Sequence, residues 1–160
     1  MAGEAFGRGL EAGPALSVLG AGPGMIDQIL LQPTGPGLHE CTDRVQAVVA
    51  RAGGRDGVCT LLVQHTSASL LIQENADPSA RRDLERWLAR LVPEGDALFT
   101  HTQEGPDDMP AHVRAALTAT SLSIPVIEGR LALGTWQGVF LWEHRRRAST
   151  RTIVAHVLVD

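Results

Sequence analysis

Apolar and polar positions along the chain predict short strands separated by helices. The most informative stretch begins at Val58 as an apolar run with both faces hydrophobic, which is typical of a strand buried on both sides. Four polar side chains then fall within residues 65–69, and a second apolar run follows from Leu70 to Ile72. Buried polar groups are costly unless they are paired. The pattern indicates either a hydroxyl-rich turn or a functional site, and the flanking His65 and Glu74 favour a site.

The rest of the chain alternates between helical and strand patterns. Strands are predicted over residues 24–32, 122–126, 129–143 and 153–159, and helices over 43–52, 77–93 and 109–119. Thr42 is expected to cap the first helix, and Asp77-Pro78 marks the start of the second. The apolar stripe of the second helix is expected to be core: Leu84, Trp87, Leu88 and Leu91. This mixture favours an α+β fold with a mixed, mostly antiparallel sheet.

Length and charge narrow the class of protein. The 160 residues suit one domain over residues 25–160, preceded by a Gly-, Ala- and Pro-rich extension over residues 1–24 that we expect to be flexible. The net charge of -4 gives no electrostatic case for binding nucleic acid or an anionic membrane. No stretch resembles a membrane span or a signal peptide. Two cysteines, Cys41 and Cys59, fit a reducing cytoplasm, and we expect both to be buried and inert.

The six histidines are the main candidates for a chemical role. His65, His101, His112 and His144 each flank a break in the apolar pattern, where the ends of strands and helices tend to converge. Neutral imidazoles suit zinc, and a catalytic zinc site typically uses three protein ligands and one open position. A structural role for any single histidine is the alternative, and the spacing forms no local metal signature.

Acidic and basic residues cluster around the later histidines. Asp107 and Asp108 precede a predicted helix, where one carboxylate could cap the helix N-terminus. The second carboxylate gains little there, so it is free to orient a ligand imidazole, bind magnesium or move a proton. We interpret the basic run Arg145–Arg147 as a solvated turn.

Four motifs carry a resemblance to a known family. They are His65-Thr66-Ser67-Ala68-Ser69, Glu74-Asn75-Ala76-Asp77-Pro78, the run Glu104 to His112, and Gly129 to Gly138 with its Leu-Gly-Thr-Trp-Gln sequence. In this order they resemble the YjbQ-like family, whose members are often described as secondary thiamine-phosphate synthases. The resemblance spans roughly residues 25–160. It implies a single compact α+β domain with a large mixed sheet, a homotrimer, and a metal held by histidines.

The resemblance also implies roles for particular residues. It implies His65, His101 and His112 as metal ligands, with His144 a weaker candidate because related chains often carry another residue after the position of Glu143. Glu74 would act as acid or base, and Asp107 or Asp108 would orient ligands or add magnesium. The expected phosphate contacts are Thr66, Ser67, Ser69, Gly134, Thr135, Trp136 and Gln137.

Three functions are compatible with these residues. The first is a metal-assisted transferase that joins a pyrimidine diphosphate to a thiazole phosphate, as the resemblance implies. Diphosphate chemistry usually uses magnesium, whereas a histidine site prefers zinc, so we interpret that activity as secondary to another reaction on a small phosphorylated substrate. The second is a metal-dependent hydrolase. The third is a trimer that binds a metal or metabolite without catalysis.

Overall fold

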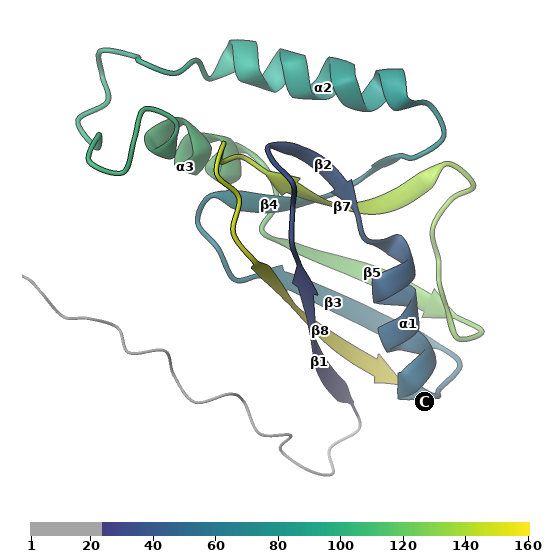
Figure 1. The fold of residues 1–160 in the computed structure, drawn as a ribbon. Coiled ribbons are helices and arrows are strands. Elements are labelled where there is room, and N and C mark those ends of the chain that lie inside the picture. The colour runs from purple at the N-terminus through teal and green to yellow at the C-terminus, as the bar shows by residue number, and fades with distance from the viewer. Residues whose placement is uncertain (1–23) are drawn as a thin grey trace, which may run out of the picture.

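The computed structural model describes residues 24–160 (Figure 1), so all but Gly24 of the predicted flexible extension lies outside the described residues. Within residues 24–160, no helix is both long enough and apolar enough to cross a membrane. The elements in chain order are β1 (Met25–Leu31), β2 (Gly37–Glu40), α1 (Thr42–Ala52), β3 (Gly57–Val63), β4 (Ala68–Glu74), α2 (Pro78–Leu91), α3 (Asp108–Leu117), β5 (Ser121–Ile127), β6 (Arg130–Leu131), β7 (Gln137–Glu143) and β8 (Arg151–Val159).

The strands form two antiparallel ladders that face each other across one core. Five strands follow the order β1-β8-β3-β5-β6, and three follow the order β2-β7-β4. Every strand pair within residues 24–160 is antiparallel. Helix α1 buries Val45, Val48 and Val49 in the same core, together with residues from both ladders such as Leu61 and Leu141. This arrangement confirms the predicted α+β class.

Helix α2 lies over the three-stranded ladder, on the side away from the five-stranded one (Figure 1). It begins as predicted, because Asp77 Oδ1 accepts the Ser79 N–H at 2.7 Å. Only Leu88 of the predicted stripe is fully buried, in a small cluster with Leu38, Phe140 and Trp142. Trp87 and Leu91 are 52% and 54% exposed, so their prediction as core was wrong. The three-stranded ladder covers a narrower part of the helix surface than the predicted apolar stripe occupies.

Two local predictions are also corrected. Thr42 does not cap α1: its Oγ1 donates to Glu40 Oε1 at 3.0 Å and accepts the Val139 N–H at 2.9 Å, which ties the helix start to β7. The predicted strand over residues 129–143 is divided into β6 and β7. A turn separates them, because the Gln137 N–H donates to the Gly134 carbonyl and the Gln137 side chain accepts the Gly134 N–H.

Both cysteines are free and buried, as predicted. Burial raises the pKa of Cys41 to about 12 and that of Cys59 to about 11. Neither thiol therefore forms an appreciable amount of reactive thiolate at neutral pH.

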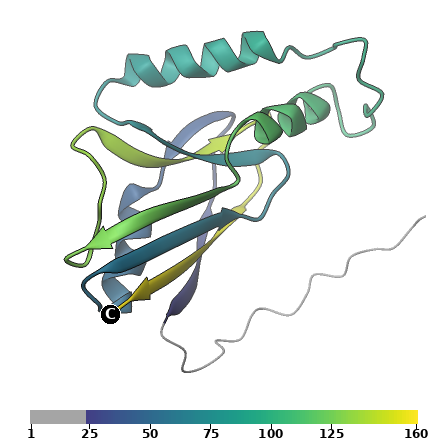
Figure 2. The same ribbon diagram turned by 180° about the vertical axis from the view of Figure 1, so that it is seen from behind.

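One face of the five-stranded ladder carries no helix (Figure 2). Large apolar side chains stand exposed on neighbouring strands of this ladder, with 39 to 59% of their surface accessible: Ile26 and Leu30 on β1, Leu158 on β8, and Leu62 on β3. Several exposed large apolar side chains on one uncovered face favour an interaction surface there.

Candidate functional site

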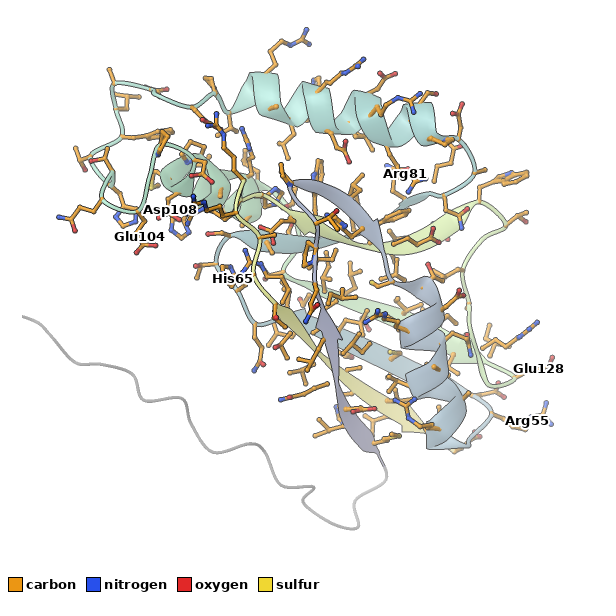
Figure 3. The ribbon with its side chains drawn as sticks, viewed as in Figure 1. Arg55, His65, Arg81, Glu104, Asp108 and Glu128 are labelled. Carbon is orange, nitrogen blue, oxygen red and sulfur yellow. The ribbon has the colours of Figure 1, made fainter. Side chains whose placement is uncertain are left out.

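Three segments far apart in the sequence meet at one end of the three-stranded ladder. Ala68 pairs with Glu143, so the loop before β4 lies beside the segment that follows β7. The loop before α3 and the first turns of α3 complete the site, and Figure 3 shows His65, Glu104 and Asp108 close together there. These segments surround a cavity of about 320 Å³, lined by His65, Thr66, Ser67, Glu104, Asp108, His112, Arg145, Arg147, Ser149 and Arg151.

Three side chains could hold a metal ion beside this cavity, of which Asp108 and His112 line it and His101 does not. Asp108 and His112 lie four residues apart on α3 and therefore share one face of the helix, while His101 comes from the preceding loop. Their ligand atoms all lie within 4.8 Å of one another. Asp108 Oδ2 is 2.8 Å from His101 Nε2 and 3.3 Å from His112 Nε2. Tetrahedral zinc with bonds of about 2.0–2.1 Å separates its ligand atoms by about 3.3 Å, so the set needs little rearrangement.

The hydrogen bonding of His112 favours a cation at this position. Its Nδ1 lies 3.0 Å from the Thr66 carbonyl oxygen, which can only accept, so Nδ1 carries a hydrogen. A neutral ring then directs its Nε2 lone pair at the Asp108 carboxylate. Two lone pairs repel unless a positive charge lies between them, either a second ring proton or a metal ion. The donor set therefore fits a divalent metal.

His65 lies outside this group. Its Nδ1 accepts the Ser67 N–H at 2.9 Å, and its Nε2 lies 3.0 Å from Arg151 Nη1. Burial, and then the Arg151 charge, lower the pKa of His65 below its ordinary value, so the ring is neutral at pH 7. The structure thus brings together two of the three predicted histidines, and Asp108 stands in the place that we expected His65 to take.

Arg145 was misread as part of a solvated turn. Its side chain is only 18% exposed. Its guanidinium donates to Asp107 Oδ2 at 3.1 Å, to Asp108 Oδ1, and to the Glu104 carbonyl at 2.9 Å. The available signal was the presence of two adjacent carboxylates and a basic run, each without a local partner. By contrast, Arg147 lines the cavity and forms no ion pair with any residue in the range 24–160.

Asp107 supports the basic segment and makes no side-chain capping hydrogen bond to α3, so the alternative role of helix cap does not apply to it. Burial alone would raise the pKa of Asp107. The Arg146 N–H and the Arg145 guanidinium outweigh burial and hold that pKa below its ordinary value. Asp107 is therefore ionised at neutral pH, and two donors already share its Oδ2 oxygen.

A buried ion pair lies behind the cavity. Arg151 donates through Nε to Glu143 Oε2 at 2.6 Å and through Nη2 to Glu143 Oε1 at 2.9 Å. Both side chains are almost fully buried. The third nitrogen, Nη1, donates to Ser149 Oγ at 2.6 Å and faces His65. This pair joins the end of β7 to the start of β8 and fixes the intervening basic segment.

The other predicted site residues lie elsewhere. Glu74 pairs with Gln137 at the opposite end of β4, six residues or about 20 Å from Ala68. Gly134, Thr135 and Trp136 belong to the same distant turn, where the Asn75 N–H donates to the Trp136 carbonyl. Ser69 is buried and lies 2.9 Å from His144 Nε2, on the far side of the strand end. Within this chain, these residues are separate from the cavity.

The sequence of this chain matches a known protein family and several of its members. Residues 27–160 match the family model described as UPF0047 protein YjbQ-like. The chain belongs to this family. It is 54% identical to the UPF0047 protein sll1880 of Synechocystis over 81% of this chain and 88% of that one. It is 44% identical to the UPF0047 protein YjbQ of Escherichia coli O157:H7 over 74% of this chain and 86% of that one.

Solved structures support the same fold. A YbjQ-like protein of unknown function from Sulfolobus solfataricus superimposes with a TM-score of 0.77, covers 86% of this chain and 98% of its own, and shares 24% identity. A YjbQ/UPF0047 family protein from Clostridium acetobutylicum gives a TM-score of 0.74 at 29% identity and covers 82% of this chain and 98% of its own. The names of these relatives state no activity, so the chemistry of this family member rests on its own site.

The buried ion pair gives a direct prediction for stability. Glu143→Gln leaves the Arg151 charge buried without a counterion, and we expect the free energy of unfolding to fall by about 3–5 kcal/mol. Urea denaturation measures this loss. Glu128→Gln is the matched control, since it breaks the exposed pair with Arg55 at the other end of the molecule (Figure 3). That change should cost at most about 1 kcal/mol. Equal effects of the two substitutions would contradict a structural role for the Glu143–Arg151 pair.

Proposed function

We propose that the protein is a metal-binding enzyme that acts on a small phosphorylated substrate. The observation that carries this proposal is the placement of a His-Asp-His group beside a cavity lined by three arginines. His101, Asp108 and His112 are the ligands we propose, and zinc is the metal that such a donor set favours. A bound zinc ion would supply Lewis-acid polarisation of a substrate oxygen.

The remaining residues of the cavity suit phosphate. Arg147 has no ion-pair partner in the range 24–160 and can turn its guanidinium toward a substrate oxygen. Arg145 and Arg151 are held in place by Asp107, Asp108 and Glu143, so their charges are preorganised beside it. Ser67 also lines the cavity. Under this proposal Asp108 is a metal ligand held by Arg145 and needs no role in proton transfer.

The narrower proposal is thiamine-phosphate synthase activity, which rests on the family resemblance. In that reaction a thiazole nitrogen forms a bond to the pyrimidine methylene carbon, and the bond from that carbon to the diphosphate oxygen breaks. The arginines would stabilise the departing diphosphate. Magnesium would enter with the diphosphate rather than on Asp107, whose carboxylate already accepts hydrogen bonds from Arg145 and Arg146.

Metal content tests the proposed ligands. His112→Ala and Asp108→Asn should each lower bound zinc at least tenfold, because each removes one of three ligands. His156→Ala is the control, since His156 lies within β8 and outside the cluster. Elemental analysis of protein loaded with zinc and then dialysed measures the ratio of metal to chain, and circular dichroism checks the fold. Wild-type zinc content in both cluster variants would refute the ligand set.

Turnover separates the proposed reaction types. Zinc-loaded protein should release diphosphate from the pyrimidine substrate only when the thiazole phosphate is present, and Arg147→Ala should raise the KM for the phosphorylated substrate about tenfold or more. Arg55→Ala, at the opposite end of the molecule, is the control. Phosphate release from a single substrate would instead support a hydrolase. No turnover on either kind of substrate, despite stoichiometric zinc, would contradict the enzymatic proposal.

We further propose that the protein works in the cytoplasm as a homotrimer, and the exposed apolar face of the five-stranded ladder supports self-association. Leu62→Asp places a charge on that face and should shift the mass measured by light scattering from trimer to monomer. Leu98→Asp is the control, because Leu98 is 84% exposed in the loop after α2. A wild-type protein of monomer mass at micromolar concentration would overturn this assignment.

A further inference from the structure

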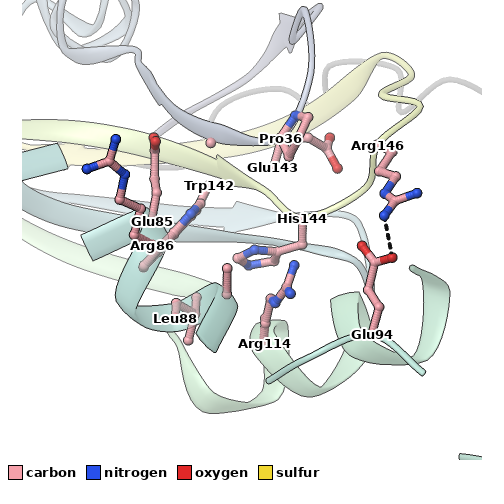
Figure 4. A pocket seen from close by; sticks show the side chains of 12 residues that line it. Pro36, Glu85, Arg86, Leu88, Glu94, Arg114, Trp142, Glu143, His144 and Arg146 are labelled. Atoms are coloured by element: carbon pink, nitrogen blue, oxygen red, sulfur yellow. Dashed lines mark ion pairs between the residues drawn. The ribbon is translucent and has the colours of Figure 1, made fainter. Parts of the chain in front are cut away.

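A second cavity, of about 340 Å³, lies between α2 and the end of β7 (Figure 4). It shares no lining residue with the first cavity. His144 and Arg146 line the second cavity, whereas Arg145 and Arg147 line the first. The two cavities are therefore separate sites on either side of one strand end.

The second cavity contains an arginine with incomplete partners. Arg114 reaches it from α3 and donates through Nη2 to the Val92 carbonyl at 2.7 Å. Its Nε is buried and has no hydrogen-bond partner in the described part of the chain. No carboxylate among residues 24–160 lies within ion-pair distance of this guanidinium. The charges of Glu94 and Asp107 act on it only from farther away, and Glu94 pairs with Arg146 at 2.6 Å. A partly buried guanidinium with an unpaired N–H and no direct ion pair favours an anionic ligand beside it.

His144 adds a second donor. Its Nε2 lies 2.9 Å from the hydroxyl of the fully buried Ser69, which has no other side-chain partner within residues 24–160. The hydroxyl hydrogen can be satisfied only if Ser69 donates to Nε2, so the ring hydrogen belongs on Nδ1. Burial, followed by the Arg114 charge, lowers the pKa of His144 to about 3, which keeps the ring neutral. Figure 4 shows the Arg114 guanidinium and the His144 ring side by side in the cavity.

The remaining walls suit a flat apolar body. Leu88 and Ala89 of α2 line the cavity together with Trp142, which packs in one cluster with Leu88. The Trp142 and His144 rings lie 5.5 Å apart between centroids. We propose that this cavity binds a small organic carboxylate with a planar apolar body, its carboxylate on Arg114 and His144 and its body against Trp142 and Leu88. The volume is that of a small metabolite site.

The fixed carboxylates beside the cavity disfavour a doubly charged phosphate. Glu85 and Glu94 line the cavity, as do Arg146 and the exposed Arg86, which forms no ion pair within residues 24–160. Glu85 is held by the Leu38 N–H at 2.8 Å, and Glu94 by Arg146. These fixed carboxylates would repel the second charge of a phosphate monoester. One guanidinium and one imidazole donor match the two oxygens of a carboxylate.

Calorimetric titration with benzoate, benzamide and phenyl phosphate tests this site in the full-length protein. Benzoate should bind saturably, and benzamide and phenyl phosphate at least tenfold more weakly. Arg114→Gln should weaken benzoate binding at least tenfold while leaving zinc content unchanged. His112→Ala, in the other cavity, should leave benzoate binding unchanged. Zinc content and benzoate binding are measured separately. The proposed function could therefore fail its own test while benzoate still binds in the second cavity.

A second variant guards against a folding defect in Arg114→Gln. Ala89 is exposed on α2 at the edge of the cavity, so Ala89→Phe can fill the space without disturbing the core. It should also weaken benzoate binding at least tenfold. Equal binding of benzoate and benzamide, unchanged binding in both variants, or no saturable binding at millimolar benzoate would each overturn the proposal.

Discussion

The buried carboxylate of Asp108 is the interaction on which the candidate site depends. Asp108 is 1% exposed at the start of α3, with Arg145 on one oxygen and His101 and His112 on the other. A carboxylate taken out of water needs such partners, because an unpaired buried charge is strongly unfavourable. One partner is the permanently charged Arg145 guanidinium, and the other two are imidazoles whose nitrogen atoms suit a metal. The carboxylate thus joins a fixed positive charge to a candidate ligand set.

The arrangement of strands explains how this carboxylate acquires its partners. The β4–β7 ladder ends where Ala68 pairs with Glu143, and the Glu143–Arg151 ion pair fixes the segment that leaves this ladder for the other. That segment presents alternate side chains to two cavities. One cavity is lined by Asp108 and His112 together with three arginines, and the other by Arg114 and His144 together with Trp142 and Leu88. A single strand end thus borders two cavities with different linings.

Much of the fold followed from local patterns in the sequence. The apolar runs on either side of His65 became β3 and β4, and the Asp77-Pro78 pair starts α2 through a side-chain cap. Family resemblance pointed to His101 and His112, which the structure brings together. The partnership of Asp108 with Arg145 was missed because it joins residues 37 positions apart, and only the topology of the sheet brings them into contact. The exposure of Trp87 was missed for a related reason, since helical spacing does not reveal how wide a surface the helix covers.

The central claim is that a metal ion binds between the loop and the first turns of α3. Anomalous diffraction at the zinc edge, from crystals soaked in zinc, tests it most directly because it locates the ion and its ligands together. The account predicts one strong peak within bonding distance of His101 Nε2, His112 Nε2 and an Asp108 oxygen. A peak coordinated by His65 in place of Asp108, or no peak at this cavity, would contradict it.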